Sequence, residues 1–126
     1  MKRVLYDTGV LIAADRNDRR VWAEHRARLE RGMQVVVPTP VIAQVSRSSR
    51  QAGLRHLLAG CETAPLLEGA AHRAGALLGR AKTTDVVDAT LVAVAVERGA
   101  DIVTGDRDDI ERLVAASGER VVIVDV

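Results

Sequence analysis

Short apolar runs alternate with longer stretches of helical periodicity along the whole chain. The short runs are rich in Val, Leu and Ile and are typical of buried strands; they cover residues 3–6, 35–37, 61–64, 102–103 and 121–124. The stretches between them are predicted to be helices over residues 8–14, 19–31, 41–45, 51–59, 66–78, 86–96 and 108–116. This alternation predicts an α/β fold in which helices cover both faces of a parallel sheet.

Residues 86–96 are apolar almost all round and are predicted to form a central buried helix, which Gly99 ends. At eleven residues this segment is too short to span a membrane, and no other apolar run approaches 18 residues. The N-terminus lacks the apolar region of a signal peptide, and Cys61 is the single cysteine. We therefore expect one cytoplasmic domain over residues 1–126 with no membrane segment.

Composition and charge add a possible partner to this picture. Aromatic residues make up only 2% of the chain and Phe is absent, so the core must be aliphatic. Residues 1–55 carry eleven Lys and Arg against five acids, whereas residues 56–126 carry seven against twelve. Arginine suits phosphate, so a basic first half beside an acidic second half could seat a polyanion next to a metal site. The alternative is that the arginines lie on solvated helix faces.

Four aspartates occupy positions that a parallel sheet would bring together. Asp7 follows the first predicted strand, Asp106 follows the strand at 102–103, and Asp85 and Asp88 begin the buried helix. Ligands of open parallel sheets bind beyond the carboxyl ends of the strands. Clustered carboxylates repel one another unless a cation joins them, and oxygen ligands suit Mg²⁺ or Mn²⁺.

Each of these acids also has a structural alternative. Asp7 could be a helix N-cap, Asp85 and Asp88 could form a variant capping box, and Asp106 could start the last helix. Other chemistry finds no support, because the three histidines and Cys61 show no ligand spacing, no glycine-rich phosphate loop is present, and neither Ser46 nor Ser48 has an obvious base. Trp22, the single tryptophan, is either a core residue or part of a surface for a partner helix.

Four segments in this order resemble the PIN-domain family, specifically the toxins of VapBC-type toxin–antitoxin pairs. They are residues 5–12 (LYDTGVLI), 41–47 (VIAQVSR), 85–89 (DVVDA) and 103–109 (VTGDRDD). The resemblance implies a three-layer α/β/α sandwich with a central parallel sheet. It also implies a Mg²⁺- or Mn²⁺-dependent endoribonuclease, a VapB-type antitoxin as partner, and a toxin homodimer.

The resemblance also implies roles for individual residues. It makes Asp7 and Asp88 the principal metal ligands and Asp106 a further catalytic acid, whereas Asp85 would contact the metal through water. Thr8 and Thr104 would hydrogen-bond to the metal ligands. Arg47 and Arg50 are our candidates for holding the RNA backbone, and Asp109 is expected only to start a helix.

One position departs from the family pattern. The family's second acid is a Glu in the short helix after the second strand, and Gln44 stands there. An amide oxygen binds Mg²⁺ more weakly than a carboxylate does, so the presence of Gln44 argues against a second bound ion. The main alternative is therefore a PIN-fold binding module without nuclease activity. The triplet Asp7-Thr8-Gly9 also occurs in aspartic proteases, but those are all-β. A receiver domain would need two acids after the first strand and a Lys late in the chain. This chain has one acid at that place, and its only lysines are Lys2 and Lys82.

Overall fold

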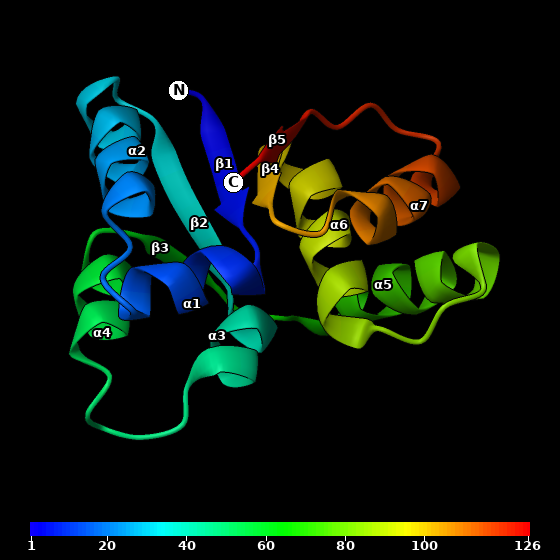
Figure 1. Cartoon of the computed structure of the whole chain (residues 1–126). Coiled ribbons are helices and arrows are strands. Elements are labelled where there is room, and N and C mark those ends of the chain that lie inside the picture. The colour runs from blue at the N-terminus through cyan, green and yellow to red at the C-terminus, as the bar shows by residue number, and fades with distance from the viewer.

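The chain, described over residues 1–126 by a computed structural model, contains twelve regular elements (Figure 1). The strands are β1 (Arg3–Tyr6), β2 (Gln34–Pro38), β3 (Glu62–Ala64), β4 (Asp101–Thr104) and β5 (Ile123–Asp125). The helices are α1 (Thr8–Asp15), α2 (Arg19–Glu30), α3 (Thr39–Val45), α4 (Ala52–Ala59), α5 (Glu68–Ala81), α6 (Val86–Arg98) and α7 (Arg107–Ser117). All the strands and helices predicted from the periodicity are therefore present.

The five strands form one parallel sheet in the order β3-β2-β1-β4-β5. Helices α1, α2 and α4 lie on one face and α5, α6 and α7 lie on the other, while α3 lies below the sheet between α1 and α6 (Figure 1). The predicted α/β fold with a three-layer α/β/α arrangement is confirmed.

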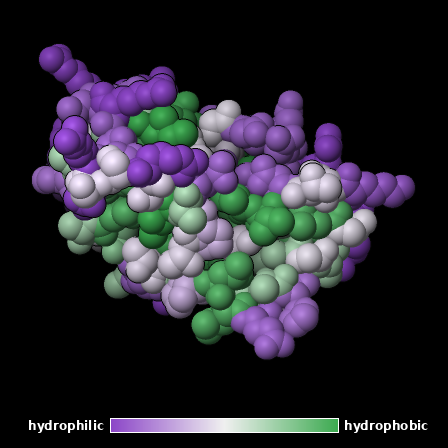
Figure 2. All heavy atoms as spheres, turned by 90° about the horizontal axis from the view of Figure 1, so that it is seen from below, coloured by the Kyte–Doolittle hydropathy of each residue, from purple (hydrophilic) through white to green (hydrophobic).

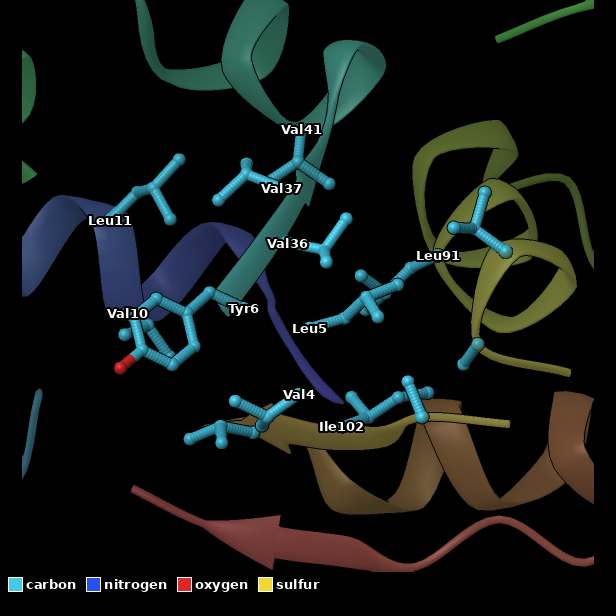
Figure 3. Packing of buried hydrophobic residues seen from close by; sticks show 14 of the residues in the cluster. Val4, Leu5, Tyr6, Val10, Leu11, Val36, Val37, Val41, Leu91 and Ile102 are labelled. Carbon is cyan, nitrogen blue, oxygen red and sulfur yellow. The ribbon is translucent and has the colours of Figure 1, made fainter. Parts of the chain in front are cut away.

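Strand β1 runs through the middle of the core, and its side chains alternate between the two layers of helices. Leu5 meets Leu91 from α6, whereas the ring of Tyr6 lies beside Val10 of α1 on the opposite face (Figure 3). The buried side chains are almost all aliphatic, as the composition predicts, and Tyr6 is the one aromatic ring that is fully buried. This packing fixes the end of β1, and therefore the position of Asp7.

The path of the chain creates a crevice between β1 and β4. After β1 the chain moves to β2 and β3 on one side of the sheet, and it later returns to β4 on the other side. Tyr6 pairs with Val103 at the carboxyl ends of the two strands. Ligands of such sheets bind where the strand order reverses in this way, beyond the carboxyl ends.

Helix α6 is buried from Asp88 to Ala95 and ends at Gly99, which has a left-handed backbone with φ of 62°. This confirms the predicted buried helix and its glycine stop. None of the helices has the length and apolar character of a membrane span.

Helix α5 differs from the prediction, since it runs from Glu68 to Ala81 rather than from 66 to 78. Leu67 keeps an extended backbone after Pro65, and Leu77 and Ala81 pack on the core at the other end. Tertiary packing thus continues the helix three residues beyond the predicted end at Leu78.

Candidate functional site

The carboxyl ends of β1 and β4 open into an acidic cavity of about 360 Å³. Its lining consists of Asp7, Thr8, Gly9, Gln44, Asp85, Val87, Asp88, Gly105 and Asp106. The structure therefore brings together all four predicted aspartates with Thr8 and Gln44. Figure 2 views the molecule from the side of this edge and shows hydrophilic side chains around patches of hydrophobic surface.

Asp7 is buried, with 4% of its surface exposed, and both of its carboxylate oxygens accept hydrogen bonds. The backbone N–H of Thr8 donates to Oδ1 at 2.7 Å, and the hydroxyl of Thr104 donates to Oδ2 at 2.6 Å. The same hydroxyl of Thr104 accepts from the N–H of Asp106 at 2.9 Å. Thr104 therefore links the two strand ends and fixes the orientation of Asp7, although it lies beneath the cavity lining.

The capping alternatives hold together with the placement in the cavity. Asp7 is the N-cap of α1, and Asp85 is the N-cap of α6 through its hydrogen bond from the N–H of Asp88 at 3.0 Å. Asp106 occupies the N-cap position of α7 but makes no side-chain capping bond. Helix starts thus direct three carboxyl groups toward one cavity, where positive helix ends partly offset their charge.

Asp88 experiences the strongest electrostatic perturbation in the site. Burial, together with the charges of Asp7, Asp85, Asp106 and Asp109, raises the pKa of its carboxyl to about 7, and burial is the largest of these causes. A carboxyl group that is hard to ionise among other acids gains most from a cation, because the cation offsets both the burial and the repulsion.

Asp106 and Asp109 are exposed neighbours at the first turn of α7. The pKa of Asp106 is raised mainly by a hydrogen bond with the carboxyl group of Asp109, then by burial and by nearby acids. Asp109 was expected only to start a helix, and its closeness to the site was missed. Its spacing of three residues from Asp106 repeats that of Asp85 and Asp88, and this repetition is the sequence signal that could have identified it.

Three carboxylates lie close enough to hold one cation. Oxygen atoms of Asp88, Asp106 and Asp109 all lie within 4.8 Å of one another. Ligands opposite each other on a Mg²⁺ ion are about 4.2 Å apart, so small side-chain rotations would close this set. Oxygen-only ligands fit Mg²⁺ or Mn²⁺. Asp7 lies in the same cavity but outside this closest group.

The three remaining residues named from the sequence occupy different positions around the cavity. Gln44 is exposed on α3 and forms part of the cavity wall, in a place where it adds no charge. Arg47 follows α3, and its guanidinium donates to the carbonyl oxygens of Ala43 and Ser46 at 3.1 and 2.9 Å. Arg50 is exposed on the next loop and does not line the acidic cavity.

A larger cavity, of about 830 Å³, lies between α2 and α4 and contains none of these acids. Trp22 lines it, is half-buried, and donates from its indole nitrogen to the carbonyl of Ala14 at 2.9 Å. Trp22 therefore packs on the core and is also partly exposed in this cavity, so both alternatives describe part of its environment.

Comparison with solved structures finds the same fold in several other chains. The VapBC2 complex of Rickettsia felis bound to a promoter DNA fragment contains a chain with 14% identity, a TM-score of 0.73 and 98% coverage of both chains. FitAcB of Neisseria gonorrhoeae matches with 17% identity, a TM-score of 0.68 and 96% coverage of both chains. A toxin–antitoxin complex of Klebsiella pneumoniae matches with 20% identity and a TM-score of 0.64, over 84% of this chain and 88% of that one.

Sequence comparison gives the family. A comparison with curated protein sequences found no match. The family model described as the PIN domain matches residues 4–115, which include every acid of the cavity. With the parallel sheet, the acidic crevice beyond β1 and β4, and this match over most of its length, the chain belongs to the PIN-domain family.

Proposed function

We propose that this chain is a Mg²⁺- or Mn²⁺-dependent endoribonuclease and the toxin of a type II toxin–antitoxin pair. The observation that carries the proposal is the convergence of five aspartates, namely Asp7, Asp85, Asp88, Asp106 and Asp109, at the edge where β1 and β4 end. PIN domains are typically nucleases, which supports phosphodiester hydrolysis as the reaction.

The burial and contacts of each residue suggest its role in the proposed reaction. Asp88, Asp106 and Asp109 would hold the cation, together with Asp7, which Thr104 and the N–H of Thr8 keep oriented. When bound, the cation supplies Lewis-acid polarisation of a phosphate oxygen and lowers the pKa of an attacking water. A carboxylate of the cluster that remains free would orient this water or accept its proton as the water oxygen bonds to phosphorus. The bond from phosphorus to the leaving ribose oxygen would break in the same step, and that oxygen would take a proton from solvent.

RNA recognition would rest on the phosphate backbone. Arg47 lies three residues after Gln44, just past the end of α3, and its guanidinium is anchored on backbone carbonyls, which suits a fixed phosphate contact. Arg50 is free to reach RNA from the exposed loop. With aromatic residues at 2%, little base stacking is available, so RNA shape and charge would decide binding.

The partners follow from the comparisons and from the surface. One structural relative comes from a complex named as a toxin–antitoxin complex and another from VapBC2, which supports a VapB-type antitoxin for this chain. Leu67 and Val86 are 68% and 55% exposed at the starts of α5 and α6, and we propose that such apolar surface serves a homodimer. A small neighbouring gene for a DNA-binding protein that co-purifies with this chain would support the pair. Isolation of a monomer at every concentration would count against the homodimer.

Nuclease activity is tested by incubating structured RNAs with purified protein in Mg²⁺, in Mn²⁺ and in chelator. We expect metal-dependent fragments with wild type and their loss in Asp7→Asn and Asp88→Asn. Glu119→Gln removes the same charge from an exposed loop at the opposite edge of the sheet and should cleave like wild type. Equal RNA profiles for wild type and Asp7→Asn would overturn the nuclease proposal for those RNAs.

A PIN-fold binding module without nuclease activity is the second candidate, and Gln44 is the observation that favours it. Gln44→Glu supplies the missing charge in the cavity wall and should raise Mg²⁺ affinity, measured by calorimetry, if the side chain reaches the ion. Ala43→Glu adds the same charge one residue earlier on α3, outside the cavity, and serves as the control. RNA cleavage that appears only in Gln44→Glu would identify the natural chain as the inactive module.

A further inference from the structure

A second cavity, of about 290 Å³, adjoins the acidic one and lies between the end of α1 and the loop of residues 46–51. Gln44 lines both cavities, so they are neighbours on the surface with this side chain between them. Arg16 and Arg47 line the second cavity, and the sequence had indicated roles for Arg47 and Gln44 but not for Arg16. Its volume is near the lower limit of about 300 Å³ for small-ligand pockets.

Gln51 holds this second cavity in shape by using both ends of its side-chain amide. Its oxygen accepts from the N–H groups of Arg47 and Ser48 at 2.6 and 3.1 Å. Its nitrogen donates to the carbonyl of Val45 at 3.0 Å and to the carboxylate of Asp15 at 3.3 Å. The loop after α3 is thereby fixed to the end of α1, and these hydrogen bonds fix the backbone positions of Arg16 and Arg47 relative to each other.

The charge available in this cavity is positive. Asp15 is its only acid, and its two oxygens already accept from the backbone N–H of Leu54 at 3.0 Å and from Gln51. Arg16 is exposed and belongs to none of the ion pairs of the chain. Arg47 uses one guanidinium nitrogen on backbone carbonyls, which leaves its other donors for a ligand.

We propose that this Arg16–Arg47 cavity binds a backbone phosphate of single-stranded RNA next to the phosphate held at the acidic cavity. The inference rests on the proposed nuclease function and adds Arg16 as a substrate-binding residue. Guanidinium groups match phosphate oxygens in pairs, and two of them beside a negatively charged cavity give the RNA strand a defined path across Gln44. The strand would enter or leave the site on the side of α1 and α3.

The test measures RNA binding without cleavage, by fluorescence anisotropy of a mixed-sequence single-stranded RNA in chelator over a range of salt concentrations. For each phosphate contact, the slope of log K against log salt changes by about 0.7 on single strands. Arg16→Gln should reduce the slope by that amount and weaken binding several-fold. Arg120→Gln is the matched control, because Arg120 is exposed in the loop before β5, at the opposite edge of the sheet.

The outcomes separate this inference from the nuclease proposal. If Arg16→Gln and Arg120→Gln bind RNA with the same affinity and slope while wild type cleaves RNA, the second cavity is not a phosphate site and the nuclease survives. If Arg16→Gln loses slope but no protein cleaves RNA, the phosphate site survives and the nuclease proposal fails. If Arg16→Gln loses affinity for a poly-glutamate peptide but none for RNA, the arginines serve an acidic protein segment and the inference is overturned. Equal melting temperatures of the variants exclude misfolding as the cause.

Discussion

At the scale of single residues, folding places Asp88 where its ionised carboxylate is destabilised, and a bound cation would remove this destabilisation. The residue is 7% exposed on the first turn of α6, and the pKa of its carboxyl, about 7, lies far above the ordinary value of 3.8. Between these two pH values the folded chain holds a proton that the unfolded chain has lost. The stability of the metal-free protein must therefore depend on pH in this range.

Stability should fall as the pH rises, because the folded state binds the extra proton. The contribution of Asp88 is fully present below pH 3.8 and is lost as the pH rises through about 7. We expect a loss of roughly 2–3 kcal/mol between pH 5 and pH 8, measured by urea unfolding in chelator. Asp88→Asn should show a much flatter dependence. Parallel pH curves for the two proteins would show that Asp88 titrates normally.

Thr90 gives a second residue-scale prediction. Its hydroxyl is completely buried on α6 and has no hydrogen-bond partner. Thr90→Val keeps the shape and removes the unpaired group, so the free energy of unfolding should rise by about 1 kcal/mol. Thr104→Val is the informative contrast, because the hydroxyl of Thr104 bonds both Asp7 and the N–H of Asp106 and its loss should destabilise the fold. Destabilisation by Thr90→Val would indicate that the hydroxyl is satisfied.

At the scale of secondary-structure elements, the crossing of α1 and α4 depends on Gly53. A methyl group there would lie 2.9 Å from the carbonyl oxygen of Ala14 and 3.0 Å from the Cα of Asp15, both of which are backbone atoms. The two helices therefore approach each other so closely that only glycine, which has no side chain, fits at this position without a backbone shift. This close approach also places Asp15 next to α4 and Gln51, whose hydrogen bond to Asp15 shapes the Arg16–Arg47 cavity.

Gly53→Ala should destabilise the protein by about 1–3 kcal/mol, because the backbone of α1 must move away. Gly75→Ala is the matched control in α5, where an added methyl group meets nothing within 4 Å. That change should stabilise by about 0.5–1 kcal/mol through helix propensity. Thermal or urea unfolding of the two variants measures the opposite signs. Stabilisation by both changes would show that α1 and α4 can separate freely.

The same scale shows why the fold was predictable from the sequence. Strands and helices followed from apolar periodicity because each element packs one defined face, or all of its faces, on the core. The acids at 7, 88 and 106 could be placed at one edge because every strand runs in the same direction. Only element ends were misplaced, as at α5, where packing of Ala81 on the core extends the helix beyond the predicted end.

The parts of the site that escaped prediction depend on contacts between elements. Asp109 joins the acidic group because α7 starts immediately after Asp106 and turns its first residues toward α6. Arg16 lines a cavity only because Gln51 ties the loop after α3 to Asp15. The repeated three-residue spacing hints at Asp109, but apolar periodicity reveals neither arrangement, because each depends on contacts between side chains of different elements.

At the scale of the whole molecule, the uneven charge of the sequence becomes a division between layers. The basic first 55 residues form β1, α1, α2, β2, α3 and the start of α4, whereas the acidic remainder includes α5, α6 and α7. The acidic cavity lies where these layers meet, beside the Arg16–Arg47 cavity. A polyanion and a cation can therefore be held next to each other, each facing charge of the opposite sign.

Binding of a cation at that boundary should stabilise the entire fold. A ligand that binds only the folded state adds about 2.7 kcal/mol at one hundred times its dissociation constant, so Mg²⁺ or Mn²⁺ should raise the melting temperature. The rise should be larger at pH 8 than at pH 5.5, because the proton on Asp88 competes with the ion below about pH 7. Sodium chloride at equal ionic strength controls for screening, and Glu119→Gln controls for loss of a distant charge. A melting temperature that responds equally to sodium chloride and Mg²⁺ would mean that the acidic cavity holds no specific ion. An equal rise in Asp88→Asn would mean that Asp88 does not hold the ion.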